Sequence, residues 1–295
     1  MSEYKYTQLT QRDELPCLEI KHPKFAAAIS LQGGQLLEFF SKQWGDLIWL
    51  SPSAAYKQGV SIRGGVPICW PWFGAATKNP DIVQTDIRTH DLAHGFVRNA
   101  LFELNKIEES NDQVEVYLSL NSHGHFLEYW PYEFKLNYRL VLSEHIELEL
   151  QTVNLDNAPF SFTQALHSYF PADIRTCEIH GTDSTVYIDS LENWTSKQGQ
   201  LVTKIEQEVD RIYRHGGPYS ITTSSNNGIR ISSNALDAVI WNPWIEKSKH
   251  LSQFANEDYK TMLCIESANV LDNAITLNAN ASHTLWVKIE GFFNQ

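Results

Sequence analysis

The chain has 295 residues, of which 42% are hydrophobic and 20% are charged, and its formal net charge is −12. This composition is that of a globular protein with a large core, and the negative charge argues against nucleic acid or an anionic membrane surface as a partner. It does not argue against a small anionic ligand, which responds first to the charges beside it.

The N-terminal segment, MSEYKYTQLTQRDELPCLEI, lacks the apolar stretch of a signal peptide, and no part of the sequence is apolar over the length of a membrane span. The four cysteines, at positions 17, 69, 177 and 264, show no paired spacing. We therefore expect reduced thiols, a cytoplasmic location and no contact with a membrane.

The first unusual segment is SIRGGVPICWPWFG, residues 61–74, which combines an arginine, paired glycines, two prolines and three bulky aromatic residues. Prolines are not expected inside a central strand, and a solvated loop would not carry two tryptophans and a phenylalanine. The segment therefore predicts an irregular wall that holds Arg63 in a fixed place.

The next segment, AHGFVRN, contains His94 and Arg98. A guanidinium group offers a planar set of donors that matches phosphate oxygens, so Arg98 is a candidate arm of an anion site. Taken by itself, a single arginine fits a surface ion pair at least as well.

Apolar and polar residues alternate with period two in the runs 114–120, 134–142, 146–150 and 285–289. This period is typical of half-buried strands, and turns rich in Gly, Asn and Pro separate the runs. Only 246–259 could hold one or two helical turns. The pattern predicts an all-β fold, an antiparallel sandwich or barrel, and the lack of a linker or repeat predicts a single domain over 1–295.

Between two of these runs, SHGHFLEYW places His123, His125 and Glu128 at a spacing that imitates a cupin metal site. The spacing to the glutamate is too short for that pattern, and no downstream glycine-rich segment supplies a fourth ligand. We therefore expect no metal.

Two polar residues lie on apolar faces of strand-like segments. In FTQALHSYF, His167 shares a face with Ala165 and Tyr169, and in KTMLCIESANV, Glu266 shares a face with Cys264. A carboxylate is costly to bury unless it has a partner or a function. A hydrogen-bonded core histidine and a glutamate at a strand end that reaches water are the structural alternatives.

Asp210 lies in EQEVDRIYRH, where charges of both signs crowd together, so the segment alone indicates a solvated surface. In DAVIWNPWIEK, Trp241 and Trp244 flank an Asn-Pro pair. Aromatic faces beside an amide suit a sugar ring, and packing against a strand end explains them equally well.

Six of these segments together resemble one family, the D-hexose-6-phosphate mutarotases, which form the glucose-6-phosphate 1-epimerase branch of the aldose 1-epimerase (galactose mutarotase-like) superfamily. The segments are SIRGGVPICWPWFG, AHGFVRN, LHSYF, VDRIY, WNPWIEK and MLCIES, and the resemblance extends over roughly residues 25–290. It implies a large antiparallel β-sandwich and an enzyme that interconverts the α and β anomers of a hexose 6-phosphate, most simply glucose 6-phosphate. It implies no cofactor and a small-molecule sugar phosphate as the partner, and we expect a monomer.

The resemblance also implies roles for single residues. His167 matches the catalytic acid and Glu266 the catalytic base. The expected substrate-binding residues are Arg63 and Arg98 for the 6-phosphate, Asp210 for a sugar hydroxyl, His94 beside the sugar ring, and Trp241, which we add for its aromatic face.

One departure from the family pattern concerns the substrate contacts. The family commonly has a glutamine just before the histidine of the HGF motif, and this chain has Ala93 there. Either the contact is missing, or Gln84 or His90 supplies it. Two other functions remain open at this point: a mutarotase for unphosphorylated aldoses, against which the arginines argue, and a sugar-binding module without catalysis, against which the histidine and glutamate argue.

Overall fold

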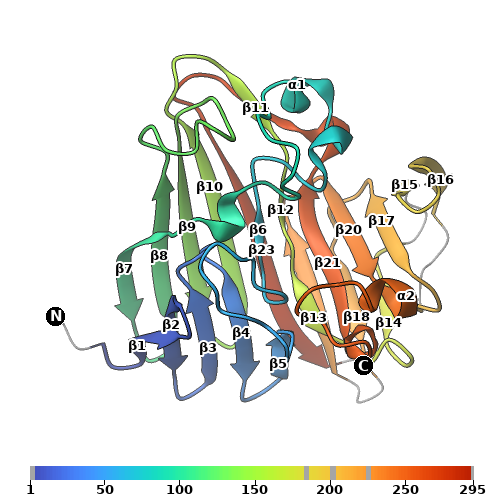
Figure 1. The fold of residues 1–295 in the computed structure, drawn as a ribbon. Coiled ribbons are helices and arrows are strands. Elements are labelled where there is room, and N and C mark those ends of the chain that lie inside the picture. Colours follow the sequence, from blue (N-terminus) through green and yellow to red (C-terminus); the bar gives the residue numbers. More distant parts are fainter. Residues whose placement is uncertain (1–3, 183–185, 200–203, 224–226, 294–295) are drawn as a thin grey trace.

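The computed structural model describes residues 4–182, 186–199, 204–223 and 227–293, and its regular structure consists mainly of antiparallel strands. The strands form two layers that face each other across a hydrophobic core (Figure 1). The predicted all-β fold, a large antiparallel β-sandwich, is confirmed.

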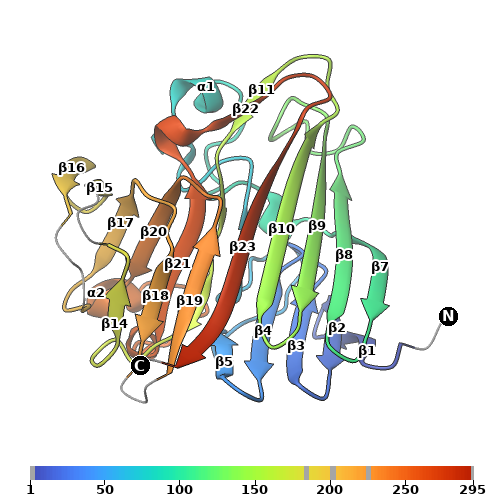
Figure 2. The same cartoon turned by 180° about the vertical axis from the view of Figure 1, so that it is seen from behind.

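One layer is a single eight-stranded sheet with the strand order β14-β18-β19-β23-β10-β9-β8-β7, seen from its own side in Figure 2. Its strands are β7 (Glu103–Glu109), β8 (Val114–Asn121), β9 (Phe134–Leu142), β10 (Ile146–Asn154), β14 (Glu178–His180), β18 (Tyr219–Thr222), β19 (Asn227–Ser233) and β23 (Ser282–Phe293). β23 is the long central strand, since it pairs with β10 along one part of its length and with β19 along another.

The other layer contains two sheets side by side (Figure 1). The first has the order β1-β2-β3-β4-β5, with β1 (Thr7–Arg12), β2 (Leu15–Lys21), β3 (Phe25–Ser30), β4 (Leu36–Ser41) and β5 (Gly45–Ile48). The second has the order β16-β15-β17-β20-β21-β12-β6, and β13 also pairs with β21. Its strands are β6 (Ile68–Cys69), β12 (Gln164–Leu166), β13 (Tyr169–Pro171), β15 (Val186–Asp189), β16 (Thr195–Gln198), β17 (Val209–Tyr213), β20 (Asp237–Asn242) and β21 (Met262–Asn269).

A two-stranded sheet, β11 (Phe160–Phe162) with β22 (Ile275–Leu277), and short helical turns complete the described fold. The helical turns are η1 (Ala76–Lys78), α1 (Asp81–Gln84), η2 (Val97–Asn99), α2 (Trp244–Ser248), η3 (Asp258–Lys260) and η4 (Leu271–Asn273). The helical turns expected within 246–259 are confirmed by α2 and by η3, which lie at the two ends of that range. The other turns were not predicted, because three or four residues are too few to show a helical period.

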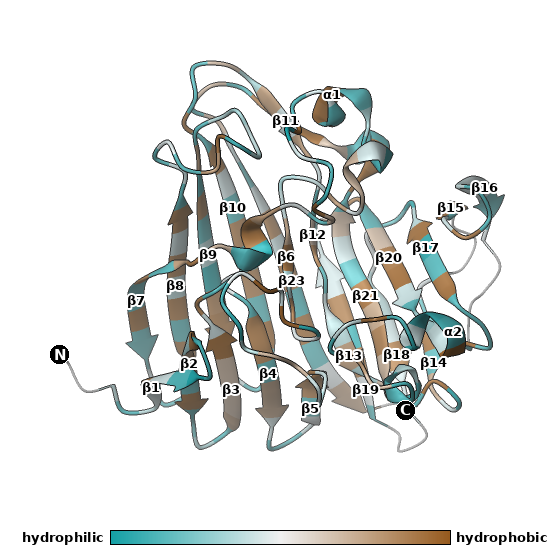
Figure 3. Cartoon of the chain, in the orientation of Figure 1, coloured by the Kyte–Doolittle hydropathy of each residue, from teal (hydrophilic) through white to brown (hydrophobic). Residues whose placement is uncertain are grey.

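The strands form because alternate side chains enter the core. From Phe134 to Leu140 in β9, Phe134, Leu136, Tyr138 and Leu140 are buried and the residues between them are only partly buried, and the last two residues of the strand are both buried. Figure 3 shows strongly hydrophobic residues in bands along the strands of both layers. Burying such side chains stabilises the fold by about 1.5–3 kcal/mol each. The alternation that predicted the four strand runs is thus the pattern that fills the core.

Two further expectations concern the chain as a whole. The four cysteines are buried and none is in a disulfide, as expected. No helix in the part of the chain that the structure describes is long and apolar enough to cross a membrane.

Candidate active site

The segment 61–74 is a wall between the two sheets of one layer, hydrogen-bonded on both sides. Towards β5, the amide of Gly65 donates to the carbonyl of Trp49 (2.7 Å), and towards β12 and β13, the amides of His167 and Tyr169 donate to the carbonyls of Pro67 (2.9 Å) and Gly65 (3.0 Å). Gly65 has φ +68°, and a Cβ there would lie 2.3 Å from the carbonyl oxygen of Leu36, so only glycine allows this close approach. The wall fixes the backbone beside Arg63, as the sequence predicted.

The tryptophans of this wall anchor it in the core. Trp70 and Trp72 are fully buried, and the indole Nε1 of Trp72 donates to the carbonyl of Leu92 (3.0 Å). Because both side chains point into the core, the backbone between them cannot move without exposing a large apolar area.

Strand register brings His167 and Glu266 together. In the pairing of β12 and β13 with β21, Leu166 lies opposite Ser267 and Tyr169 lies opposite Cys264. The register is therefore the same on both sides of the gap between β12 and β13, and it sets His167 opposite Glu266. His167 Nε2 lies 3.3 Å from Glu266 Oε1, and the two side chains are almost entirely buried.

Asp210 and Trp241 lie on the same face of this sheet. Asp210 of β17 pairs with Trp241 of β20, which pairs with Cys264 of β21. Cross-strand partners share a face, and so do residues two apart along a strand, so this row adjoins Glu266. The Trp241 ring meets the His167 ring edge to face, with centroids 6.2 Å apart.

His94 approaches His167 from a different element. Its backbone has φ +62°, and the next residue, Gly95, has φ +69°. His94 Nδ1 accepts a hydrogen bond from the amide of Gly74 (3.2 Å), and the ring packs edge-on against Phe73 (4.8 Å). This conformation brings the His94 ring centroid to 5.6 Å from that of His167.

The two predicted arginines lie near the histidines and keep donors to spare. Arg63 donates through Nε to the carbonyl of Ser252 and through Nη1 to the hydroxyl of Tyr169, both at 3.4 Å. Arg98 donates through Nη2 to the carbonyl of Ala93 (2.6 Å), while its Nε is buried with no partner in the described part of the chain. A guanidinium carries five N–H groups, so each arginine can still bind an anion.

The charges of the two arginines act on His167. The pKa of His167 is lowered to about 3. Burial is the largest cause, and the positive charges of Arg98 and then Arg63 add to it. Burial, with Asp210 adding to it and Arg98 opposing it, raises the pKa of Glu266 well above its ordinary value. The 3.3 Å contact therefore joins a carboxyl group whose pKa is raised and an imidazole whose pKa is lowered, so burial favours the neutral form of both groups.

Two further titratable groups of the site are also perturbed. Burial lowers the pKa of His94 well below its ordinary value, and the electrostatic effects of Arg98, His167 and Arg63 act in the same direction. Burial raises the pKa of Asp210, opposed by Lys247, whose Nζ lies 3.9 Å from its Oδ2. Lys247 was not predicted, because the sequence alone gives no sign that α2 returns to β17.

Several buried polar atoms of the site have no hydrogen-bond partner among the described residues: Glu266 Oε2, His167 Nδ1 and Arg98 Nε. Buried polar groups are normally paired, because an unpaired one costs roughly 1–3 kcal/mol. Their clustering around one sheet face is what a site for a polar ligand shows. An apolar group of residues on the same face, Cys69, Ala165, Ile212, Val239 and Ala268, adjoins them.

The two residues weighed as replacements for the family glutamine are not equivalent. Gln84 belongs to α1, and its amide donates to the carbonyl of Ala76 (3.5 Å). His90 is exposed. At Ala93 the backbone carbonyl, rather than a side chain, serves the site by holding Arg98.

The metal-like motif lies elsewhere. His123, His125 and Glu128 are exposed residues of the connection between β8 and β9. Among the residues that the structure describes, no group of three His, Cys, Asp or Glu side chains is arranged to hold a metal ion.

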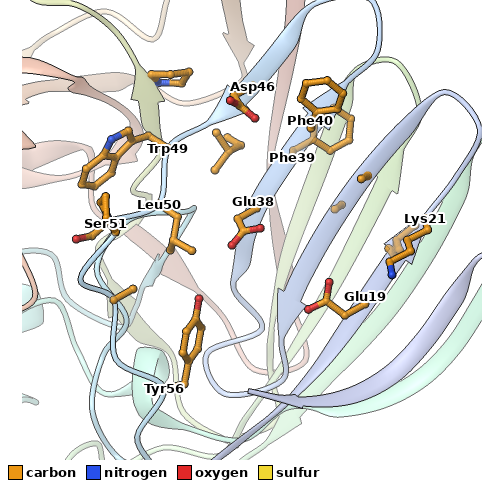
Figure 4. Close-up of a pocket in the computed structure, with 17 residues that line it drawn as sticks. Glu19, Lys21, Glu38, Phe39, Phe40, Asp46, Trp49, Leu50, Ser51 and Tyr56 are labelled. Carbon is orange, nitrogen blue, oxygen red and sulfur yellow. The ribbon is translucent and has the colours of Figure 1, made fainter. Parts of the chain in front are cut away.

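A hollow of about 520 Å³ lies over β2–β5, and Trp49 is among the residues that line it (Figure 4). Glu19, Glu38 and Asp46 are among its lining residues, and none of the predicted site residues is. Its relation to the site is indirect: Trp49 lines it and stacks on Tyr169 (5.9 Å), the neighbour of His167.

The sequence and the fold of this chain are both similar to those of known proteins. Residues 16–290 match the family described as Aldose 1-epimerase. The chain is 31% identical over 266 residues to a Salmonella typhimurium protein named "Putative glucose-6-phosphate 1-epimerase", covering 87% of this chain and 84% of that protein. It is 32% identical over 268 residues to a protein of the same name from Cenchrus ciliaris, covering 85% and 77% of the two chains.

Solved structures agree with the sequence matches. A crystal structure titled as a putative mutarotase (YeaD) from Salmonella typhimurium superposes with a TM-score of 0.88 at 28% identity, covering 98% of this chain and 95% of that chain. A galactose mutarotase related enzyme from Lactobacillus acidophilus superposes with a TM-score of 0.70 at 15% identity, covering 94% and 97%, and shares the fold.

Proposed function

The chain belongs to the aldose 1-epimerase family, and on that premise we propose that it interconverts the α and β anomers of a hexose 6-phosphate, with glucose 6-phosphate as the expected substrate. The names of the relatives from Salmonella typhimurium and Cenchrus ciliaris support this substrate class. The observation that carries the proposal is the buried contact of His167 Nε2 with Glu266 Oε1 (3.3 Å). Such a pair, with two arginines acting on it, suits acid–base chemistry on an anionic sugar.

In the proposed reaction the sugar ring opens and closes again on the other face of C1. The Glu266 carboxylate takes the proton of the C1 hydroxyl, His167 as imidazolium gives a proton to the ring oxygen, and the bond from C1 to that oxygen breaks. The C1–C2 bond of the open aldehyde then rotates, and the two side chains exchange roles as the ring closes. Each positioned proton transfer contributes about 10²–10⁴-fold to the rate.

Burial favours the neutral forms of Glu266 and His167, so substrate binding has to favour the ionised pair that the reaction needs. A phosphate dianion beside Arg63 and Arg98 offsets the positive charges that lower the pKa of His167. A sugar hydroxyl that donates to Glu266 lowers the pKa of that carboxyl. Both effects favour the ionised form of the pair, and its 3.3 Å contact gives the proton a direct route.

The phosphate assignment depends on Arg63 and Arg98. The net charge of −12 repels a phosphate dianion at long range, so binding has to come from local cations. The two guanidinium groups retain unused donors, and the wall of residues 61–74 holds one of them rigidly. Asp210, His94 and Trp241 are proposed to contact the sugar.

In the proposed reaction Glu266 and His167 accept and donate every proton that moves, so we propose no metal or organic cofactor. We also propose that a monomer of one domain carries the activity in the cytoplasm. The four cysteines are not in disulfides, which supports the cytoplasmic location. The hydrophobic core that the sheets share supports the single domain.

The test is mutarotation of freshly dissolved α-glucose 6-phosphate, followed by polarimetry or exchange NMR, with glucose and galactose as comparison substrates. We expect the protein to speed equilibration of the phosphorylated sugar far more than that of the other two. Faster turnover of the free sugars would make this a mutarotase for unphosphorylated aldoses. Binding of all three sugars without any acceleration would make it a sugar-binding module.

A further inference from the structure

Tyr169 lies against the expected catalytic histidine. Its ring is parallel to that of His167, with centroids 4.8 Å apart and an interplanar angle of 8°. The two residues are two apart in sequence, so their side chains leave the backbone on the same face. Only 2% of Tyr169 is exposed, so its ring is almost entirely shielded from water.

The same side chain reaches the expected phosphate ligand. The Tyr169 hydroxyl accepts a hydrogen bond from Arg63 Nη1 (3.4 Å). Arg63 is otherwise held through Nε by the carbonyl of Ser252, also at 3.4 Å. One tyrosine thus touches both the group that would bind the phosphate and the group that would protonate the ring oxygen.

The surroundings prevent the Tyr169 ring from turning. Trp49 stacks on it (5.9 Å, 19°), and Trp241 meets it edge to face (6.1 Å, 79°). The backbone of Tyr169 is hydrogen-bonded on both sides, donating to the carbonyl of Gly65 (3.0 Å) and accepting from the amide of Trp49 (2.9 Å). A side chain held this firmly can fix the orientation of the groups it touches.

We propose that Tyr169 is a positioning residue that holds Arg63 and the imidazole of His167 in one fixed relation, so that a substrate seated by its phosphate presents its ring oxygen to the acid. The inference rests on the proposed hexose 6-phosphate mutarotation. The two ends of the tyrosine have separate tasks: the hydroxyl orients the guanidinium, and the ring orients the imidazole. The electron-rich ring face also favours the imidazolium over the neutral imidazole.

The two tasks can be separated by substitution. Tyr169→Phe keeps the stack and removes the hydroxyl, so this variant should bind glucose 6-phosphate more weakly. Its KM should rise about 3- to 10-fold, the usual effect of losing one hydrogen bond, and its kcat should change less. Tyr169→Leu removes the stack, so its loss should fall mainly on kcat, which should drop about 10- to 100-fold because the acid is misplaced. The matched control is Tyr138→Phe, which removes an unpaired hydroxyl from a fully buried tyrosine on β9.

The experiment measures kcat and KM for glucose 6-phosphate in the wild type and the three variants, with thermal melts to establish folding. A higher KM in Tyr169→Phe together with a lower kcat in Tyr169→Leu supports the proposal. Equal kcat losses in both Tyr169 variants, or a Tyr169→Phe variant that matches Tyr138→Phe, would overturn it. If Tyr169→Leu does not fold, the Phe comparison alone decides. A wild type without mutarotase activity would instead overturn the proposed function.

Discussion

Loss of either arginine separates binding of the phosphate from the chemistry at C1. Arg98→Ala removes a guanidinium group whose Nη2 donates to the carbonyl of Ala93 and whose buried Nε has no partner among the described residues. In Arg63→Ala, the guanidinium held by Ser252 and Tyr169 disappears. Each variant should therefore lose at least one charge-assisted hydrogen bond to the 6-phosphate.

Hydrogen bonds to charged groups contribute roughly 1.5–3 kcal/mol each. At 1.4 kcal/mol per tenfold change, one lost bond should lower kcat/KM for glucose 6-phosphate about 10- to 150-fold. Lysine at either position should restore only part of the loss, because an ammonium group cannot make the two-pronged contact of a guanidinium.

The assay measures kcat/KM for glucose 6-phosphate and for glucose in the wild type, Arg63→Ala and Arg98→Ala. Turnover of glucose, if detectable, should change much less, since glucose has no phosphate to hold. Arg230→Ala is the matched control, because Arg230 lies on β19 of the opposite layer, packed over Phe292. Equal losses on both substrates would mean that the arginines are structural, and the mutarotase for free aldoses would then be the better assignment.

Four further predictions concern catalysis, pH, metals and the backbone. His167→Asn and Glu266→Gln should each lower kcat for glucose 6-phosphate by about 100-fold or more and change KM much less, and a folded variant with near-normal kcat would remove that residue from the mechanism. Because the pKa of His167 falls from 6.5 to about 3 in the folded protein, its contribution to stability is present above about pH 6.5 and is lost as the pH falls toward 3. In urea titrations between pH 7 and pH 4, His167→Asn should therefore lose less stability than the wild type, and equal losses would contradict a buried neutral imidazole. Exhaustive chelation should leave kcat unchanged, whereas loss of activity that one added cation restores would indicate a metal mechanism. Gly95→Ala should cost more than about 3 kcal/mol in denaturant unfolding, because the new Cβ would lie 1.9 Å from the Trp70 carbonyl oxygen at φ +69°. Its control Gly74→Ala, at φ +62° with open space around it, should cost only about 1–2 kcal/mol, and similar losses in both would refute the steric argument.

The strands of the fold could be predicted from local pattern. Each of the four alternating runs became a strand of the eight-stranded sheet, because residues two apart point to the same side of a strand whatever its neighbours are. The face shared by His167 and Tyr169 follows from the same rule, although the regular ladder breaks between them. Apart from α2 and η3, the short helical turns did not follow, because three or four residues are too few to show a helical period.

The individual site residues needed the resemblance. Read from its own segment, Asp210 belongs to a charged surface, and in the structure it is half-buried beside Trp241 on the face that carries Glu266. Burial depends on which strand lies alongside, and that is a property of the whole sheet. The resemblance indicated that Asp210 belongs to the site, but it gave no distance to any other residue.

The chain's alternation determined an antiparallel all-β fold, a sandwich or a barrel, and its motifs determined the family and with it the sandwich. The tertiary structure decided how the chemical groups meet. Register between β12–β13 and β21 puts His167 across from Glu266, although 98 positions separate them in the sequence. The 61–74 wall brings Arg63 to Tyr169, and burial shifts the pKa of His167 down and that of Glu266 up. Strand pairing and burial arise from contacts between distant segments, so no single segment of the sequence encodes them.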